Sequence, residues 1–172
     1  ALPNACIPTS PYAILVIMTD EIQGENSPGG DRQYRGGCLC GAIRYEVTGP
    51  PVVVAQCHCE ECRKLSGSGH SIGAMFPAGT LALTGELGEF KYQSAAGTEV
   101  TRAFCPICGS SILGRNTGMS GYVTIALGTM DDASDLRTQV VIYRRDRAPW
   151  DQLEPNTPCF STQPDWKPDH GI

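Results

Sequence analysis

The sequence predicts an all-β protein of antiparallel sheets built from short strands. Glycine and proline are frequent, with 20 and 13 residues among 172, and they divide the chain into short segments bounded by turns. Between these turns, apolar and polar residues alternate as they do in half-buried strands. Three groups of closely spaced cysteines interrupt the pattern, so we expect a metal site to fasten the sheets together.

The bulk composition excludes several classes of protein. The chain is 41% hydrophobic and 18% charged, which is ordinary for a globular domain with a core. The net charge is −5 and no long run of Lys or Arg occurs, so we expect no nucleic-acid partner. The longest apolar stretch, residues 13–18, is far shorter than the roughly 20 residues that cross a bilayer, and no basic segment precedes it. We therefore expect no membrane contact and a cytoplasmic location.

The domain boundaries follow from shifts in composition. Residues 1–35 include a turn-rich, linker-like stretch and are predicted to be a loose leader or an artificial extension. The alternative is an added edge strand, because residues 12–17 favour β structure. A single zinc domain is expected over residues 36–166, followed by a short tail at 167–172.

The expected elements follow one another along this domain. Residues 42–47 alternate apolar and polar side chains and predict the first strand. Residues 60–65 have the length of one or two helical turns. A hairpin is expected from residues 90–93 and 100–104 around a small-residue turn. Further short strands are predicted at 52–55, 71–76, 80–84, 122–127 and 139–144.

Seven of the nine cysteines lie in three groups, and seven is the sum of four and three. Cys105 and Cys108 flank two residues and precede Gly109, as in a zinc knuckle whose turn aims both sulfurs inward. Cys38 and Cys40 are the natural partner pair. The two pairs together predict a closed structural zinc site with four cysteine ligands. A disulfide framework is less favoured, because cysteine is about 5% of the chain, below the roughly 8–10% of such scaffolds.

Cys57, Cys59 and Cys62 lie within six residues, close enough for one turn to present three thiolates to one ion. No fourth cysteine is nearby, so this zinc would keep an open position, as catalytic zinc sites do. The alternative is a second structural site that a histidine closes. His58 is adjacent, but neighbouring side chains of an extended segment point in opposite directions. His70 is a looser candidate for that ligand.

Other residues give weaker signals. Arg63 and Lys64 follow the triplet and could hold an anionic substrate, although an exposed, solvated face is the alternative. Ser66 opens a Ser/Gly turn whose backbone N–H groups suit a carboxylate, or it belongs to a turn without function. Cys6 and Cys159 stand outside the clusters and are expected to be free thiols or small buried side chains.

The three cysteine groups, in their order and spacing, resemble the glutathione-dependent formaldehyde-activating (GFA) family, which includes the CENP-V-like proteins. The resemblance extends over about residues 34–166. Its motifs are GGCLCGAIRY at 36–45, CHCEECRKLSG at 57–67 and RAFCPICGS at 102–110.

The resemblance implies the carbon–sulfur lyase (GFA-like) fold with two zinc ions. It implies a structural zinc on Cys38, Cys40, Cys105 and Cys108, and a reactive zinc on the cysteine triplet. It also implies glutathione as co-substrate and formaldehyde as the aldehyde, condensed to S-hydroxymethylglutathione. We therefore expect a zinc-dependent carbon–sulfur lyase whose partners are a small thiol and an aldehyde. The alternatives are a thiol carrier without catalysis and a zinc-ribbon-like interaction module.

Overall fold

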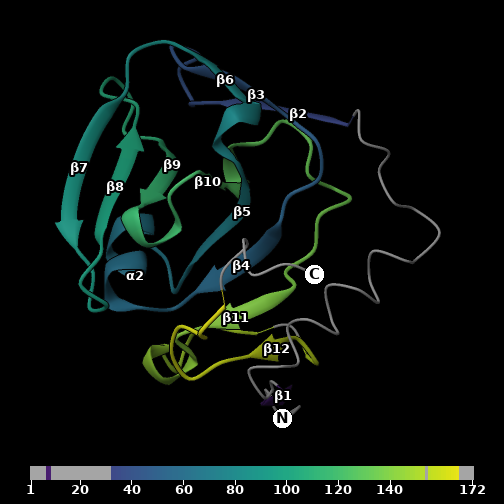
Figure 1. Cartoon of the computed structure of the whole chain (residues 1–172), viewed down its shortest axis with the longest axis vertical. Helices are drawn as coiled ribbons and strands as arrows, with labels where there is room; N and C mark the ends of the chain where they lie inside the picture. The colour runs from purple at the N-terminus through teal and green to yellow at the C-terminus, as the bar shows by residue number, and fades with distance from the viewer. Residues whose placement is uncertain (1–6, 9–31, 154, 167–172) are drawn as a thin grey trace. The chain divides into compact units, whose positions relative to one another are not determined.

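The computed structural model describes residues 7–8, 32–153 and 155–166, and these divide between two compact units (Figure 1). We name each unit by its cysteines. The four-cysteine unit comprises residues 28–53 and 73–136. The triplet unit comprises residues 1–27, 54–72 and 137–172. Each unit gathers segments that are distant in sequence, and each contains one complete cysteine cluster.

The larger sheet of the four-cysteine unit is antiparallel. Its strand order is β5-β10-β9-β8-β7, and the hairpin of β7 and β8 is prominent in Figure 1. The loop between β7 and β8 turns at Gly97, whose φ of 75° suits glycine and whose N–H donates to the Ser94 carbonyl. The strands span Ser71–Pro77 (β5), Gly88–Gln93 (β7), Glu99–Phe104 (β8), Ser111–Asn116 (β9) and Tyr122–Ala126 (β10).

The second sheet of this unit has three antiparallel strands in the order β2-β3-β6, which span Gln33–Gly37, Arg44–Thr48 and Leu81–Thr84. Alternate residues of β2 and β3 are buried, including Tyr34, Tyr45 and Val47. Gly36 permits the close approach of these strands, because a Cβ there would lie 2.3 Å from the Tyr45 hydroxyl. Short 3₁₀ segments follow three strands, at Ala78–Thr80 (η1), Thr117–Met119 (η2) and Leu127–Thr129 (η3).

The triplet unit is built differently, because its strand pairs are parallel. The order is β1-β12-β11-β4, and the strands span Ile7–Pro8 (β1), Val53–Cys57 (β4), Val140–Ile142 (β11) and Pro158–Cys159 (β12). The expectation of antiparallel sheets is therefore wrong for this unit. Strands β4 and β11 are more than 80 residues apart in sequence, so no tight hairpin constrains them to run in opposite directions.

The remaining elements of the triplet unit are helical. The helix α2 spans Glu60–Ser66 and begins at the cysteine triplet, and a 3₁₀ turn, η4, spans Arg144–Asp146. Val141, Leu153 and Cys159 form a buried cluster. Cys159 is disulfide-bonded, so the expectation of a free thiol is wrong for this residue. Cys6 lies outside the described residues.

Most expected elements are present within two or three residues of their predicted ends. The strands expected at 42–47, 52–55, 71–76 and 122–127 correspond to β3, β4, β5 and β10, and the helix expected at 60–65 is α2. Strands β1, β2, β9 and β12 were not expected from the sequence. The fold is mostly β with one short helix among the described residues, as predicted. The leader expected at 1–35 lies mainly outside the described residues, and β2 begins within it, at Gln33.

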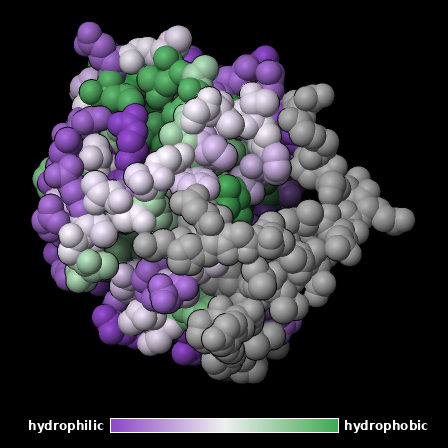
Figure 2. Space-filling model, viewed as in Figure 1, coloured by the Kyte–Doolittle hydropathy of each residue, from purple (hydrophilic) through white to green (hydrophobic). Residues whose placement is uncertain are grey.

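The surface mixes polar and apolar side chains. On the face drawn in Figure 2, hydrophilic residues are spread widely and hydrophobic residues gather in a patch near the upper edge. The large hydrophobic side chains that are exposed among the described residues are Leu39, Leu65, Phe90, Ile107 and Trp150. Within the same residues, no helix combines the length and apolar character needed to cross a membrane.

Candidate metal centres

The four-cysteine cluster is formed by two similar turns. In the first, Gly41 donates its N–H to the Cys38 carbonyl at 3.1 Å, and in the second Gly109 donates to the Cys105 carbonyl at 2.9 Å. Both glycines have a positive φ, near 80° and 75°, which a side chain would strain. The two turns thus bring Cys38, Cys40, Cys105 and Cys108 together within the four-cysteine unit.

The sulfur spacing of this cluster fits zinc. The Sγ atoms of Cys38 and Cys40 are 3.5 Å apart, and those of Cys40 and Cys105 are 3.7 Å apart. A tetrahedral ion with Zn–S bonds of 2.3 Å separates its sulfur ligands by about 3.8 Å. The four sulfurs are therefore arranged as a closed tetrahedral site requires, and four thiolates are a zinc donor set.

Neighbouring donors stabilise the anionic sulfurs. The N–H of Ile43 donates to Cys38 Sγ at 3.2 Å, and the Ser110 hydroxyl contacts Cys108 Sγ at 3.3 Å. The bond from Ser110 lowers the pKa of the Cys108 thiol to about 5. The same hydroxyl accepts a hydrogen bond from the Leu39 N–H at 3.1 Å, so it links the two turns. These contacts favour the thiolate form that binds metal.

The cysteine triplet lies where a strand meets a helix. Cys57 ends β4 opposite Ile142 of β11, and the N–H of His58 donates to the Ile142 carbonyl at 3.1 Å. Cys59 caps α2, because its Sγ accepts from the N–H of Cys62 at 3.4 Å. Cys62 is buried in the first helical turn. The three ligand atoms lie within 4.8 Å of one another.

The electrostatics of the triplet also fit a cation. Hydrogen bonds with Cys59 and Cys62, followed by burial, raise the pKa of the Cys57 thiol far above its ordinary value. Three thiolates this close repel one another unless a positive charge lies between them. Three cysteine sulfurs grouped at the junction of β4 and α2 are therefore a donor set suited to zinc.

The three residues predicted to contact glutathione lie on or beside α2. Arg63 is half-buried, and its Nε is buried without a hydrogen-bond partner in the described part of the chain. Lys64 is exposed and pairs with Glu60 at 2.7 Å. The Ser66 hydroxyl donates to the His70 carbonyl at 2.9 Å and is part of the turn. Of the three, Arg63 has the most unused hydrogen-bonding capacity.

No pattern in the sequence points to Tyr143, which follows β11. Its backbone is left-handed, with φ of 55°, a conformation that costs energy for a bulky residue. Burial, and then the charges of Cys57 and Cys59, raise the pKa of its hydroxyl. Tyr143 is therefore close enough to the triplet to sense its charge, and no residue type or spacing marks a tyrosine for this role.

Neither candidate histidine belongs to the triplet. His58 and His70 instead form a separate group with Asp151, which the sequence analysis did not single out. His58 is fully buried, and burial lowers the pKa of its imidazole. As expected for an extended segment, His58 faces away from its two cysteine neighbours and joins this second group.

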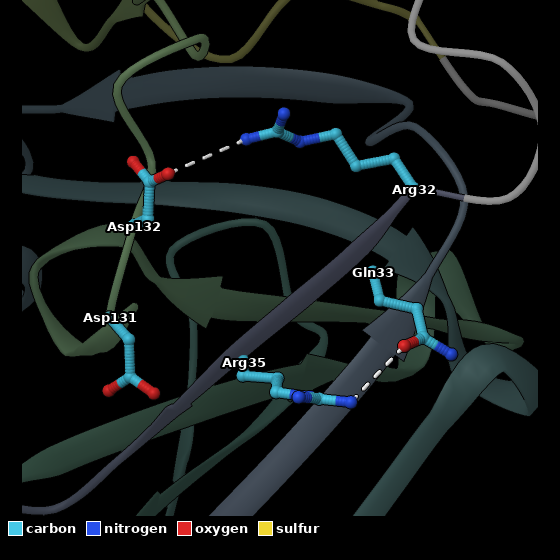
Figure 3. A pocket seen from close by; sticks show the side chains of 5 residues that line it. All are labelled: Arg32, Gln33, Arg35, Asp131 and Asp132. Atoms are coloured by element: carbon cyan, nitrogen blue, oxygen red, sulfur yellow. Dashed lines mark hydrogen bonds and ion pairs between the residues drawn. The ribbon is translucent and has the colours of Figure 1, made fainter.

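A polar pocket of about 340 Å³ lies elsewhere in the four-cysteine unit (Figure 3). It is lined by Arg32, Gln33, Arg35, Asp131 and Asp132. Its charges are largely balanced, because Arg32 lies 3.9 Å from Asp132 and Arg35 pairs with Glu46 at 2.7 Å. It contains no thiol and no histidine, so the metal chemistry of the chain does not involve it.

A mostly β fold with a four-cysteine cluster and a cysteine triplet defines a class of protein suited to binding zinc through thiolates. The family model described as "Glutathione-dependent formaldehyde-activating enzyme" matches residues 33–146, about two thirds of the chain. The chain therefore belongs to the GFA family, as predicted, and carries the cysteine clusters of a zinc protein.

Two individual proteins are similar to the chain. A Halomonas elongata protein, itself only provisionally described as a glutathione-dependent formaldehyde-activating enzyme, is 34% identical over 82 residues. The match covers 45% of this chain and 52% of the relative, so the chain spans about half of that protein's length. A crystal structure of a Rhodobacter sphaeroides protein has a TM-score of 0.47 and 21% identity, and covers 58% of this chain and 90% of the other.

Proposed function

We propose that the protein is a zinc-dependent carbon–sulfur lyase that acts on a thiol–aldehyde adduct, with glutathione and formaldehyde as the leading pair. The observation that supports this most is the composition of the triplet group. Within the described residues, Cys57, Cys59 and Cys62 are grouped without a fourth Cys, His, Asp or Glu ligand. Three ligands are the number that catalytic zinc sites use, because one position stays open for substrate.

The proposed reaction is an addition without redox change. The sulfur of glutathione attacks the carbonyl carbon of formaldehyde, so a carbon–sulfur bond forms and the π pair of the carbonyl moves to oxygen. The proton lost by the thiol ends on that oxygen, which gives S-hydroxymethylglutathione. The reverse reaction breaks the same bond and releases both components.

The triplet would hold the zinc that this reaction uses. When bound, the ion would stabilise an incoming thiol as thiolate near neutral pH. The three thiolates of Cys57, Cys59 and Cys62 would carry more negative charge than a zinc ion carries positive charge. The ion would therefore be a poor Lewis acid, which favours sulfur chemistry over the activation of water. We also propose that Tyr143 donates a hydrogen bond beside the triplet, because it directly follows Ile142, which pairs with Cys57 in the register of β11 and β4.

We propose Arg63, Lys64 and Ser66 as contacts for the carboxylates of glutathione. Arg63 is favoured, because its buried Nε has no partner among the described residues. A guanidinium binds carboxylates in a planar, two-pronged geometry. Lys64 would have to release Glu60 to take part, and Ser66 would have to leave the His70 carbonyl.

The test is exchange NMR on an equilibrium mixture of glutathione and formaldehyde, with and without sub-stoichiometric protein. Because the reaction also proceeds without catalyst, the quantity measured is the increase in exchange rate that the protein causes. We expect acceleration that disappears when zinc is stripped and returns when zinc is restored. Broadened glutathione signals without acceleration would indicate that the protein is a thiol carrier and not an enzyme.

An interaction module is the second candidate, and the ends of the two zinc-binding turns favour it. Leu39 is 89% exposed and Ile107 is 75% exposed, each between the two cysteines of its turn. Exposed hydrophobic side chains at fixed positions are a usual basis for protein contacts. This candidate predicts no binding of glutathione in the NMR experiment, with both zinc ions serving stability alone.

We propose a cytoplasmic location, which the seven free cysteines in chelating groups support. The disulfide at Cys159 is the observation against it, because disulfides are rare in reducing compartments. Alkylation of thiols in intact cells, followed by mass spectrometry, tests the location. We expect the seven clustered cysteines to be recovered as reduced thiols, and their recovery as disulfides would place the protein in an oxidising compartment.

A further inference from the structure

Two imidazoles in the triplet unit converge on one carboxylate oxygen. The Nδ1 of His58 lies 3.1 Å from Oδ2 of Asp151, and the Nδ1 of His70 lies 2.9 Å from the same oxygen. The three residues come from separate parts of the unit, after β4, before β5 and after η4. No cysteine belongs to this group, so it is independent of the metal centres described above.

Hydrogen bonding alone does not account for the group. His58 is fully buried, yet its Nδ1 has no hydrogen-bond partner, because its geometry toward Asp151 is too poor for one. Buried polar atoms are normally satisfied, and each exception needs an explanation. An ion bound between the three ligand atoms would satisfy the Nδ1 lone pair and would also account for the oxygen that the two rings share.

The spacing fits metal ligation. Ligands held at about 2.0–2.2 Å from one ion lie about 2.9–3.5 Å apart, depending on the coordination angle. The two measured nitrogen–oxygen distances are within this range. The rings of His58 and His70 are tilted by 48° with centroids 5.2 Å apart, so they approach the carboxylate from different directions rather than stacking in parallel.

The surroundings support the same arrangement. The side-chain amide of Gln56 lies with its nitrogen 3.3 Å from Nε2 of His58. An ion at Nδ1 leaves Nε2 protonated, so the Gln56 amide must turn its oxygen toward this N–H to orient the ring. Arg147 donates to the backbone carbonyl of Asp151 and not to its carboxylate, which instead faces the two imidazoles. A Cβ on Gly69 would lie 2.3 Å from Cγ of Asp151, so only glycine at this position lets the carboxylate approach.

We propose that His58, His70 and Asp151 bind a third divalent transition-metal ion. Two imidazoles and one carboxylate are donors for zinc, cobalt or iron in the divalent state, whereas Mg²⁺ and Ca²⁺ prefer oxygen ligands. The ion connects the segment after η4 to the residue between two cysteines of the triplet. His70 is only partly buried, with 27% of its side chain exposed, and gives the ion a route of entry.

The first experiment counts bound zinc by equilibrium dialysis of the full chain against buffered free zinc. We expect three ions per chain in the unmodified protein and two in His70→Ala and in Asp151→Asn. Asp146→Asn is the matched control, because Asp146 lies on the adjacent η4 turn and pairs with Arg145 at 3.5 Å, so this variant keeps three. Two ions in the unmodified protein, or three in both ligand variants, would overturn the proposal.

A second measurement uses cobalt and does not depend on activity. Co²⁺ added to protein whose cysteine clusters already hold zinc is expected to broaden the imidazole signals of His58 and His70, without a sulfur-to-metal absorption band. Gly69→Ala keeps every ligand but displaces the carboxylate, so it should abolish the broadening while circular dichroism stays unchanged. Unbroadened imidazole signals in the unmodified protein would contradict the site, whatever the exchange activity.

Discussion

The two cysteine clusters differ in how the chain assembles them. The four-cysteine cluster joins two glycine turns that are more than 60 residues apart, and Cys105 within it is fully buried. The triplet comes from six consecutive residues at the junction of β4 and α2, and two of its cysteines are only partly buried. The four-cysteine cluster therefore joins segments that are distant in sequence, whereas the triplet presents three sulfurs from a single segment.

This difference indicates which of the two metal sites supports folding and which supports chemistry. Ligands from distant segments can be brought together only in the folded chain, so binding free energy becomes folding free energy. Ligands from one short segment are near one another before folding and contribute less to the global fold. We expect loss of the first site to unfold its unit, and loss of the second to abolish chemistry in a folded protein.

The largest effect is predicted for Cys105→Ser. Zinc binding to structural sites contributes about 10–16 kcal/mol in zinc-finger peptides, which is as large as the whole stability of most domains, roughly 5–15 kcal/mol. The variant should lose one zinc and its cooperative thermal transition, as measured by metal analysis and circular dichroism. A variant that melts near the temperature of the unmodified protein would show that this cluster does not stabilise the fold.

A smaller effect is predicted for Arg63→Ala. This variant tests whether a residue beside the triplet affects substrate binding without affecting the fold. Charged hydrogen bonds contribute about 1.5–3 kcal/mol, so KM for glutathione should rise about 10-fold or more while the thermal midpoint stays unchanged. The rate with 2-mercaptoethanol, a thiol without carboxylates, should be unaffected. An equal loss of exchange rate with both thiols would show that Arg63 supports the fold and does not bind the carboxylates of glutathione.

Lys64→Ala is the matched control on the same helix. Lys64 and Glu60 are both more than half exposed, and exposed pairs at this spacing contribute only about 0.3–0.5 kcal/mol. Denaturant unfolding should therefore be nearly the same as for the unmodified protein. The exchange rate should fall much less than in Arg63→Ala, because Lys64 has to release Glu60 before it can bind glutathione. A KM increase as large as that of Arg63→Ala would give Lys64 the main role in binding.

The four-cysteine unit should also set the alkaline limit of stability. Burial is the main cause that raises the pKa of both Tyr34 and Tyr45 to about 12. Because the unfolded chain ionises near pH 10 and the folded chain near pH 12, the stability is full below pH 10 and falls as the pH rises through this window. Urea unfolding at pH 9 and pH 11 measures the loss.

The double variant Tyr34→Phe, Tyr45→Phe supplies the control for this pH effect. It removes the hydroxyl bonds to Asp135 and Thr129, which measure 2.8 and 2.9 Å, together with both ionisable groups. Its stability should be lower at pH 9 but should decline less between pH 9 and pH 11. An unchanged slope would mean that other groups govern the alkaline transition.

Much of this arrangement was predictable from the sequence. The cysteine spacing identified both clusters, because the knuckle turn of Cys105 and Cys108 requires only local residues and Gly109. Alternating patterns located most strands of the four-cysteine unit. The parallel pairing of β4 with β11 could not be predicted, because neither segment contains a sequence pattern that determines the relative direction of the two strands.

The remaining features depend on tertiary contacts that leave no local pattern. His58 and His70 attracted attention only as ligands for the triplet, whereas Asp151, 81 residues after His70, draws both into a separate group. Tyr143 lies beside the triplet through the register of β11 and its left-handed backbone. Neither the register nor the backbone angle follows from residue type.

The most direct test of the division between the two clusters is the exchange rate of glutathione and formaldehyde with Cys57→Ser, measured beside the unmodified protein. Loss of several kcal/mol of metal assistance should lower the protein-dependent rate at least about 100-fold. The variant should remain folded and keep the zinc of the four-cysteine cluster. A rate equal to that of the unmodified protein, in a variant shown to lack the triplet zinc, would contradict the account.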